Sequence, residues 1–389
     1  MKKTPDKSQP KTAQRREGYA SQIAPKAISQ ARQDVATWKM ALRQAEQVND
    51  PKRVRLQYLY RDIMLDALLT SQIENRKRMT TGSAFVLKDK SGNIDVENTA
   101  LLQSASWFNQ LRGYIQDTTF MGTTVIEFIT DDSGLKVVLL PRTNIAPEKG
   151  LLLFDENSTT GTDYRVAKEY GTWVLEFGNP KDFGLLNKAV PHILFKRFAQ
   201  SCWSELCEIY GIPPRVLKTN TRDGAMLTRA EQMMRDMGAA AWFIIDESET
   251  FEFATGVSTK GEVYESLIRL CSNETCLLIS GAVIGQDTKN GNESKEKVSI
   301  GMLKSLVDSD KRNETSAMNE KVLPALFRIG YLPDGLTYEY EPQEDIEQLY
   351  TRTIGFAPYV ELDPEWIKEK FGVEVTALKQ QGGKGANFQ

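Results

Sequence analysis

Two amphipathic segments that lie far apart in the sequence, residues 188–211 and 262–284, constrain the fold most. In the first, apolar residues recur at helical spacing and mark one stripe, made of Phe195, Phe198, Ala199, Cys202, Leu206 and Ile209. In the second, one side carries Leu267, Cys271, Leu278 and Ala282, and the other carries mostly Glu262, Ser266, Arg269, Asn273 and Ser280. Two such helices joined by an insert are expected to pack as an antiparallel pair. One polar face of the pair then remains for water or a partner.

The ends of the first helix are marked by residues that suit helix termini. Pro191 is suited to a first helical turn, and Gly211 followed by Pro213 and Pro214 predicts a sharp stop.

The insert between the two helices, residues 212–261, predicts a small αβ module. PRVLKTN reads as a strand, AMLTRAEQMMRDMG as a helix, and AWFII and TFEFA as two further strands. A module of this size cannot bury much surface alone. We therefore expect copies of itself or another protein to complete it.

The rest of the chain divides around this unit. Residues 31–187 predict an α+β domain, with one long helix over 52–79 and a β-hairpin in TTVIEFITDDSGLKVVLLP. Residues 1–30, rich in Lys, Gln, Ser and Pro, predict a flexible arm or, alternatively, a strap onto a neighbouring subunit. A polar loop at 285–297 precedes a helical stretch, bent near Gly301, and a strand within 298–340. Residues 341–389 predict a small helical tail with a loose end.

Charge and composition narrow the class of protein. The 389 residues include 49 basic and 52 acidic ones, a net charge of -3, which argues against a sequence-unspecific duplex binder. No apolar run approaches the roughly 20 residues that span a bilayer, and the start has no apolar core typical of a signal peptide. The four cysteines fit a reducing compartment. We expect an intracellular, soluble protein without a membrane partner.

The sequence contains little that predicts catalysis, a metal or a cofactor. His192 is the single histidine, and its place in a first helical turn favours a structural role. The two C-x4-C pairs turn through about 140° on a helix and converge poorly on one metal. Gly281, Gly285 and Lys289 lack the ending of a phosphate loop. Acidic pairs such as Asp131 and Asp132 favour solvated surface, with a metal-dependent nuclease as an open alternative.

The polar loop after the second helix is the one segment with a possible role towards phosphates. Its polar residues are Gln286, Lys289, Asn290, Asn292, Lys295 and Lys297. Composition favours an ordinary flexible connection. The functional alternative is transient contact with phosphates, for which lysine needs no fixed geometry.

The order of these parts resembles the portal protein of Mu-type tailed phages. A tryptophan-bearing helix runs into a YG-x-P-x-R turn, and a later helix ends in an Ile-Gly-Gln signature before a loop. The matching positions are Trp203, Tyr210, Gly211, Pro213, Arg215, Ile284, Gly285 and Gln286. LQYLYRDIMLDALLTSQIENRKRM and TTVIEF also look like the outer domain of that family, so the similarity spans most of residues 50–330.

The resemblance implies a structural protein, not an enzyme, that forms a ring, commonly of twelve subunits, at one capsid vertex. The wing would be 31–187, the stem helices 188–211 and 262–284, the clip 212–261 and the tunnel loop 285–297. Residues 298–340 would return to the wing, and 341–389 would form a reduced crown and tail. Glu262, Ser266, Arg269 and Asn273 would face the channel, with the loop residues at its narrowest part.

The resemblance also implies partners. Double-stranded DNA would pass through the channel, and the major capsid protein would surround the ring. The clip would dock the terminase large subunit and later the head–tail connector protein, through Arg215, Lys218, Arg222 and Arg229. The protein would be located in the host cytoplasm during assembly and then at the portal vertex of the virion. The alternative within the same virion is another head–tail connector or adaptor, which would lack the two long helices.

Overall fold

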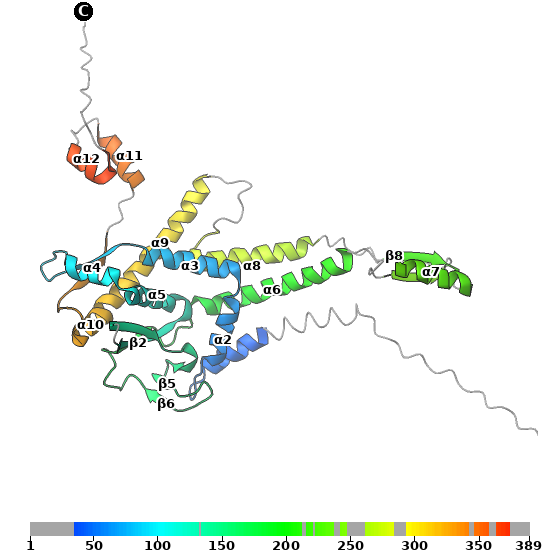
Figure 1. Ribbon diagram of the computed structural model, residues 1–389, viewed down its shortest axis with the longest axis horizontal. Helices are drawn as coiled ribbons and strands as arrows, with labels where there is room; N and C mark the ends of the chain where they lie inside the picture. The colour runs from blue at the N-terminus through cyan, green and yellow to red at the C-terminus, as the bar shows by residue number, and fades with distance from the viewer. Residues whose placement is uncertain are drawn as a thin grey trace, which may run out of the picture.

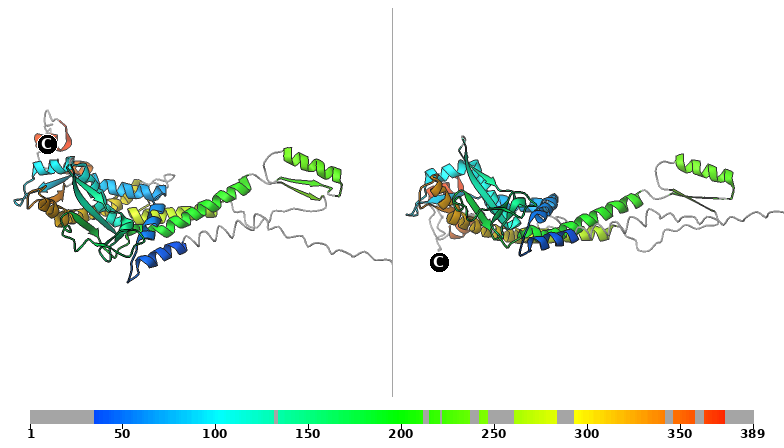
Figure 2. Two further views of the ribbon diagram at one scale, coloured as in Figure 1. Left: turned by 60° about the horizontal axis from the view of Figure 1, so that its bottom comes forward. Right: turned by 90° about the horizontal axis from the view of Figure 1, so that it is seen from below.

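An elongated arrangement of a body, a rod and two small appended units defines the structure (Figures 1 and 2). The structure, a computed structural model, describes residues 35–131, 134–211, 215–220, 222–236, 242–246, 261–283, 293–341, 346–357 and 363–373. Helices α6 (Gly184–Gly211) and α8 (Glu262–Ser280) project from the body side by side and are here called the rod. The expected arm at 1–30 lies outside the described residues.

The body combines helices with short antiparallel sheets, as predicted for an α+β domain. Its first helices are residues 35–45, α2 (Val54–Ile63), α3 (Ala67–Thr81), α4 (Val96–Ser104) and α5 (Ser106–Met121). Its strands are β1 (Phe85–Lys88), β2 (Thr123–Asp131), β3 (Gly134–Leu139), β4 (Ile145–Ala146), β5 (Leu151–Leu153), β6 (Gly161–Asp163) and β7 (Val174–Gly178), with a 3-10 turn η1 (Arg142–Asn144). The sheets have the orders β3-β2-β7, β4-β5-β6 and β1-β10.

The predicted hairpin is present as β2 and β3, with register from Ile126 opposite Leu139 to Asp131 opposite Gly134. The prediction of a single helix over 52–79 is wrong, because a turn separates α2 from α3. Asp66 has extended backbone angles there, and its carboxylate accepts a hydrogen bond from the Leu69 N–H. Such a side-chain cap starts a new helix.

Two apolar clusters fill the body. The first packs α5 against strands β1, β2, β3, β7 and β10, with Phe108, Leu111, Ile126, Phe128 and Tyr338 buried in it. The second joins residues 35–45, α2 and α3 to the base of α6, through Leu56, Tyr60, Ile63, Leu186 and Val190. The rod therefore emerges from the core of the body.

The base of α6 is also fixed by polar contacts. Arg53 is buried, and its guanidinium donates to Glu148 Oε1 (2.9 Å from Nε), to Asp182 O (2.8 Å) and to Pro180 O. α6 begins at Gly184, earlier than the predicted start at 188, so Pro191 lies inside the helix and not in its first turn. The Asp182 carboxylate accepts from the Gly184 N–H (2.8 Å), which stabilises this earlier start. The predicted stop holds, since α6 ends at Gly211.

The helix after the polar loop runs back across the body (Figure 1). It comprises α9 (Glu293–Ala317), a π-helical stretch η3 (Met318–Val322) and α10 (Leu323–Ile329), and is followed by β10 (Thr337–Tyr340). Helical geometry continues through Gly301, the expected position of a bend, and becomes irregular only at η3. Pro324 explains why the π-helical stretch lies at this point, because a proline has no N–H to donate to the preceding turn.

Two buried ion pairs attach α9 to the body. Arg76 of α3 donates to both carboxylate oxygens of Asp310 (2.6 and 2.9 Å) and to Ile279 O of α8 (2.7 Å). Arg112 of α5 donates to Glu314 Oε1 (2.7 Å), and Gln116 donates to Glu314 Oε2 (2.6 Å). Asp310 and Glu314 are one helical turn apart, so both project from the same face of α9. These pairs hold α3, α5, α8 and α9 together.

The carboxylate of Glu314 lies in a fully hydrogen-bonded polar network. Burial is the largest single effect on the pKa of Arg112 and lowers it, but Glu314, Tyr338 and Tyr340 together outweigh burial and raise that pKa above its ordinary value, so the guanidinium stays charged. Burial raises the pKa of Tyr338, which keeps its hydroxyl protonated and able to donate to Glu314 Oε1 (3.1 Å). A buried charge is tolerated only when paired in this way.

Two small units complete the fold. Beyond the far end of the rod, β8 (Arg215–Thr219) and β9 (Trp242–Asp246) pair in parallel, with α7 (Gly224–Asp236) between them in sequence. The predicted strand, helix and strand are thus present, whereas TFEFA lies outside the described residues. Near the C-terminus, α11 (Ile346–Phe356) and α12 (Pro364–Phe371) meet through the rings of Tyr350, Trp366 and Phe371.

Removing one charge from the α9 network should strongly destabilise the body. We expect Glu314→Gln to lower the free energy of unfolding by about 3–5 kcal/mol, because Arg112 would remain buried and unpaired. The matched control, Asp334→Asn, removes an acid from an ion pair whose side chains are 72% and 62% exposed, and should change it by less than about 1 kcal/mol. Denaturant titration measures both, and equal losses would contradict a special role for the α9 pairs.

Candidate functional site

The two helices of the rod pack as the predicted antiparallel pair. The start of α8 meets the outer part of α6, since a Cβ built on Gly261 would lie 2.9 Å from Trp203 Nε1. Nearer the body, Lys196 of α6 is close enough to Cys271 of α8 to lower its pKa, although burial outweighs this and raises it. α8 ends at Ser280, before the predicted end at 284. Gly281 adopts a left-handed conformation (φ 73°), which stops the helix.

One side of α8 carries the polar stripe predicted from the sequence. Glu262, Ser266 and Arg269 are exposed and Asn273 is half-buried. Spacings of four, three and four residues bring the four side chains to one face. The face is polar but mixed in charge, because it contains one carboxylate and one guanidinium.

A second stripe on α8, next to the polar one, is apolar and exposed. Val263, Leu270 and Leu277 are 64%, 56% and 47% exposed and recur every seven residues. The residues expected to be buried lie elsewhere on the helix: Cys271 and Ala282 are buried, and Leu267 and Leu278 are half-buried. Sequence reasoning missed the second stripe, although its seven-residue spacing is a recognisable signal of helix–helix contact.

The predicted loop residues are only partly described. Gln286, Lys289, Asn290 and Asn292 lie outside the described residues. α9 starts at Glu293, so Lys295 and Lys297 belong to a helix and the loop cannot extend to 297 as expected. Lys297 is exposed on the first turns of α9.

The basic residues expected on the small module beyond the rod lie on two of its elements. Arg215 and Lys218 are on β8, whereas Arg222 precedes α7 and Arg229 lies on it. Arg222 and Arg229 are exposed, as are Met226 (51%) and Met233 (50%). Spacings of three and four residues place Met226, Arg229 and Met233 on one face of α7.

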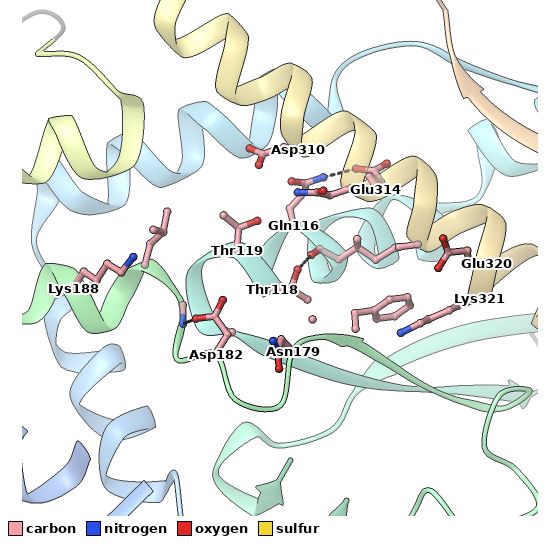
Figure 3. A pocket seen from close by; sticks show the side chains of 18 residues that line it. Gln116, Thr118, Thr119, Asn179, Asp182, Lys188, Asp310, Glu314, Glu320 and Lys321 are labelled. Atoms are coloured by element: carbon pink, nitrogen blue, oxygen red, sulfur yellow. Dashed lines mark hydrogen bonds between the residues drawn. The ribbon is translucent and has the colours of Figure 1, made fainter. Parts of the chain in front are cut away.

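A cavity of about 540 Å³ lies between α5, the start of α6 and α9 (Figure 3). Asp310 and Glu314 line it, but both carboxylates are already paired with arginines. Lys321 donates from Nζ to Glu176 O (2.7 Å), and Lys188 is exposed at the wall. Asp310 and Glu314 already bind arginines of the body and are not available to a ligand. We therefore interpret the cavity as a packing gap at the junction of body and rod.

No set of three or more His, Cys, Asp or Glu side chains is placed to hold a metal ion among the described residues. Cys271 and Cys276 are buried on α8, Cys202 is half-buried and Cys207 is exposed, and none of these four forms a disulfide. Burial raises the pKa of Cys271, which disfavours the thiolate that metals bind. Within the same residues, no helix has the length and apolar character to cross a membrane.

Comparisons with known proteins show the family of this chain. Residues 57–373 match the family model described as the portal protein of Mu bacteriophage. The match covers most of the chain, so the chain belongs to this family of phage portal proteins, and its family role is structural. A comparison with curated protein sequences found no match.

Two solved structures are also similar. One is the neck of an empty GTA particle, with 14% identity, a TM-score of 0.49, and coverage of 80% of this chain and 92% of that one. The other is an HK97-family phage portal protein from Corynebacterium diphtheriae, with 12% identity, a TM-score of 0.40, and coverage of 77% and 96%.

The contact between Gly261 and Trp203 gives a test of the rod. Gly261 has φ 75°, so Gly261→Ala should destabilise the far end of the rod by about 1–2 kcal/mol through backbone strain and crowding of the indole. Hydrogen exchange of the first turns of α8 should accelerate about tenfold, as that free energy implies. Gly113→Ala is the control, because a Cβ added at this position in α5 meets nothing within 4 Å. It should leave hydrogen exchange in the first turns of α8 unchanged. Unchanged exchange in both variants would contradict the described contact.

Proposed function

We propose that copies of this portal protein form a ring, of twelve subunits by analogy with its family, through which double-stranded DNA passes. The observation that carries the proposal is the pair of adjacent stripes on α8. The polar stripe of Glu262, Ser266, Arg269 and Asn273 would face the bore. The apolar stripe of Val263, Leu270 and Leu277 would contact the rod of the next subunit.

The charge of the polar stripe is consistent with a channel that moves DNA. Phosphate contacts made by several lysines or arginines raise the affinity for duplex DNA steeply, above all at low salt. Glu262 and Arg269 offset each other on this face, and Ser266 and Asn273 are neutral. A bore lined this way would pass DNA without holding it.

The other parts of the chain receive roles under the same proposal. The body at 31–187 and 298–340 would be the wing, next to the major capsid protein, and the rod would be the stem. Residues 212–261 would be the clip, whose Arg215, Lys218, Arg222 and Arg229 would dock the terminase large subunit and then the head–tail connector protein. The segment from 285 to the start of α9 would be the tunnel loop.

Residues 341–389 would form a reduced crown. The exposed Tyr350, Ile354 and Phe356 of α11 suit contact with other crown copies. The portal would assemble in the host cytoplasm and remain at one vertex of the virion capsid. The proposal assigns it no bond chemistry.

Ring formation should depend on the apolar stripe. We expect Leu270→Asp to leave a folded monomer and abolish rings, because the exposed leucine contributes to the contact between rods and not to the core, and a charge buried there is costly. Val166→Asp replaces a residue that is 80% exposed on the body and should leave rings intact. Size-exclusion chromatography with light scattering measures both, and normal rings from Leu270→Asp would exclude this stripe as the interface.

The lysines of the polar loop and of the first turns of α9 give a separate test. Replacing Lys289, Lys295 and Lys297 by Ala should leave ring assembly unchanged but alter the efficiency of DNA packaging or the retention of packaged DNA. Packaging assays in the phage, with Lys90→Ala on the body as control, measure the effect. Packaging and retention equal to those of the wild type would remove these lysines from the DNA path.

A further inference from the structure

The far end of the rod, residues 198–211 and 261–268, carries an unbalanced negative charge. It contains Glu205 and Glu208 on α6 and Glu262 and Glu265 on α8, and the nearest basic residue on α8, Arg269, offsets only Glu262. Glu208, Glu262 and Glu265 are exposed and Glu205 is half-buried. The carboxylates left in excess at the tip of a thin rod favour a basic partner.

Two of these acids lie on a face of α6 that is covered only near the body. Leu186 and Val190 are buried there against residues 35–45 and α2, and Arg197 then pairs with Asp62 of α2 (2.5 Å). The same face continues outward as Ser201, Ser204, Glu205 and Glu208, since spacings of three and four residues keep it in line. This outer stretch is polar, has no partner among the described residues, and is called the acidic face.

The first 16 residues of the sequence have the complementary charge. They contain six basic residues and one acid, a net charge of +5, although the whole chain carries -3. Residues 17–34 that follow have two basic and two acidic residues and are neutral overall.

The basic residues can reach the acidic face of the same chain. The described structure begins at residue 35, beside the base of the rod, where the Trp38 indole donates to Asn187 of α6 (2.9 Å). The 18 residues from 17 to 34 span up to about 60 Å when extended. The whole of α6, with 28 residues, is about 42 Å long.

We propose that residues 1–16 bind the acidic face of α6, centred on Glu205 and Glu208. The contact is a set of lysine and arginine pairs with carboxylates that water reaches, so it weakens as salt rises. It neutralises the tip of the rod and keeps the basic segment away from DNA. The acidic face is separate from the polar stripe of α8, so this proposal and the proposed channel can fail independently.

Carbodiimide cross-linking of the full-length protein tests the contact, because this reagent joins only amines and carboxylates that touch. At about 50 mM salt, mass spectrometry should find Lys2, Lys3, Lys7 or Lys11 joined to Glu205 or Glu208. At about 500 mM salt, where the Debye length is about 4 Å, the yield should fall at least about fivefold. Links that spread over carboxylates of the body, or no links at all, would overturn the proposal.

Charge reversal supplies the controls. Glu205→Lys with Glu208→Lys should abolish these links, whereas Glu97→Lys with Glu369→Lys, two exposed acids elsewhere, should leave the yield unchanged. Replacing the four N-terminal lysines by Glu in the Glu205→Lys and Glu208→Lys protein should restore links with reversed partners. If links persist in the first variant, or if the segment binds duplex DNA at about 50 mM salt while giving no links to the rod, the proposal is wrong.

Discussion

The buried pairing of Arg76 with Asp310 and of Arg112 with Glu314 is the interaction on which the arrangement of this portal protein most depends. Each arginine comes from a different helix of the body, and both acids come from α9. Arg76 also donates to Ile279 O at the inner end of α8, so one side chain connects the body, the rod and the helix after the loop. A force on α8 or α9 is therefore transmitted to the body through charged groups that cannot separate without leaving a charge buried. This rigidity would suit the proposed channel, whose shape must persist while DNA moves through it.

Because the ion pairs fix the rod to the body, the exposed surface of the rod is available for contacts with other molecules. Near the body α6 is covered by apolar contacts, but farther out the rod presents distinct polar, apolar and acidic faces. Because these faces are separate, the proposed contacts of the rod with DNA, with a neighbouring subunit and with residues 1–16 do not compete for the same side chains. Among the described side chains of the two small units only Ala230 is buried, which would suit surfaces that assembly completes.

Local patterns in the sequence predicted the local structure well. Helical spacing predicted α6 and α8, turn residues predicted the β2–β3 hairpin, and the order of segments identified the portal family. Ends of elements were less accurate, because Gly184, Gly281 and the Asp66 cap act through backbone angles that composition does not reveal. The ion pairs could not be predicted from the sequence, because Arg76 and Asp310 are 234 residues apart and each has the sequence context of an ordinary surface charge. The apolar stripe at Val263, Leu270 and Leu277 could have been predicted from its seven-residue spacing. Only the polar face beside it was predicted.

In the proposed ring, α8 turns its polar stripe towards a closed bore. A gold label on Ser266→Cys, in a protein whose exposed Cys207 is replaced by Ser, places that stripe directly in negative-stain images. We expect end-on rings with the gold within or at the edge of the central hole. Gold on the outer rim of the rings, or compact particles without a hole, would contradict it.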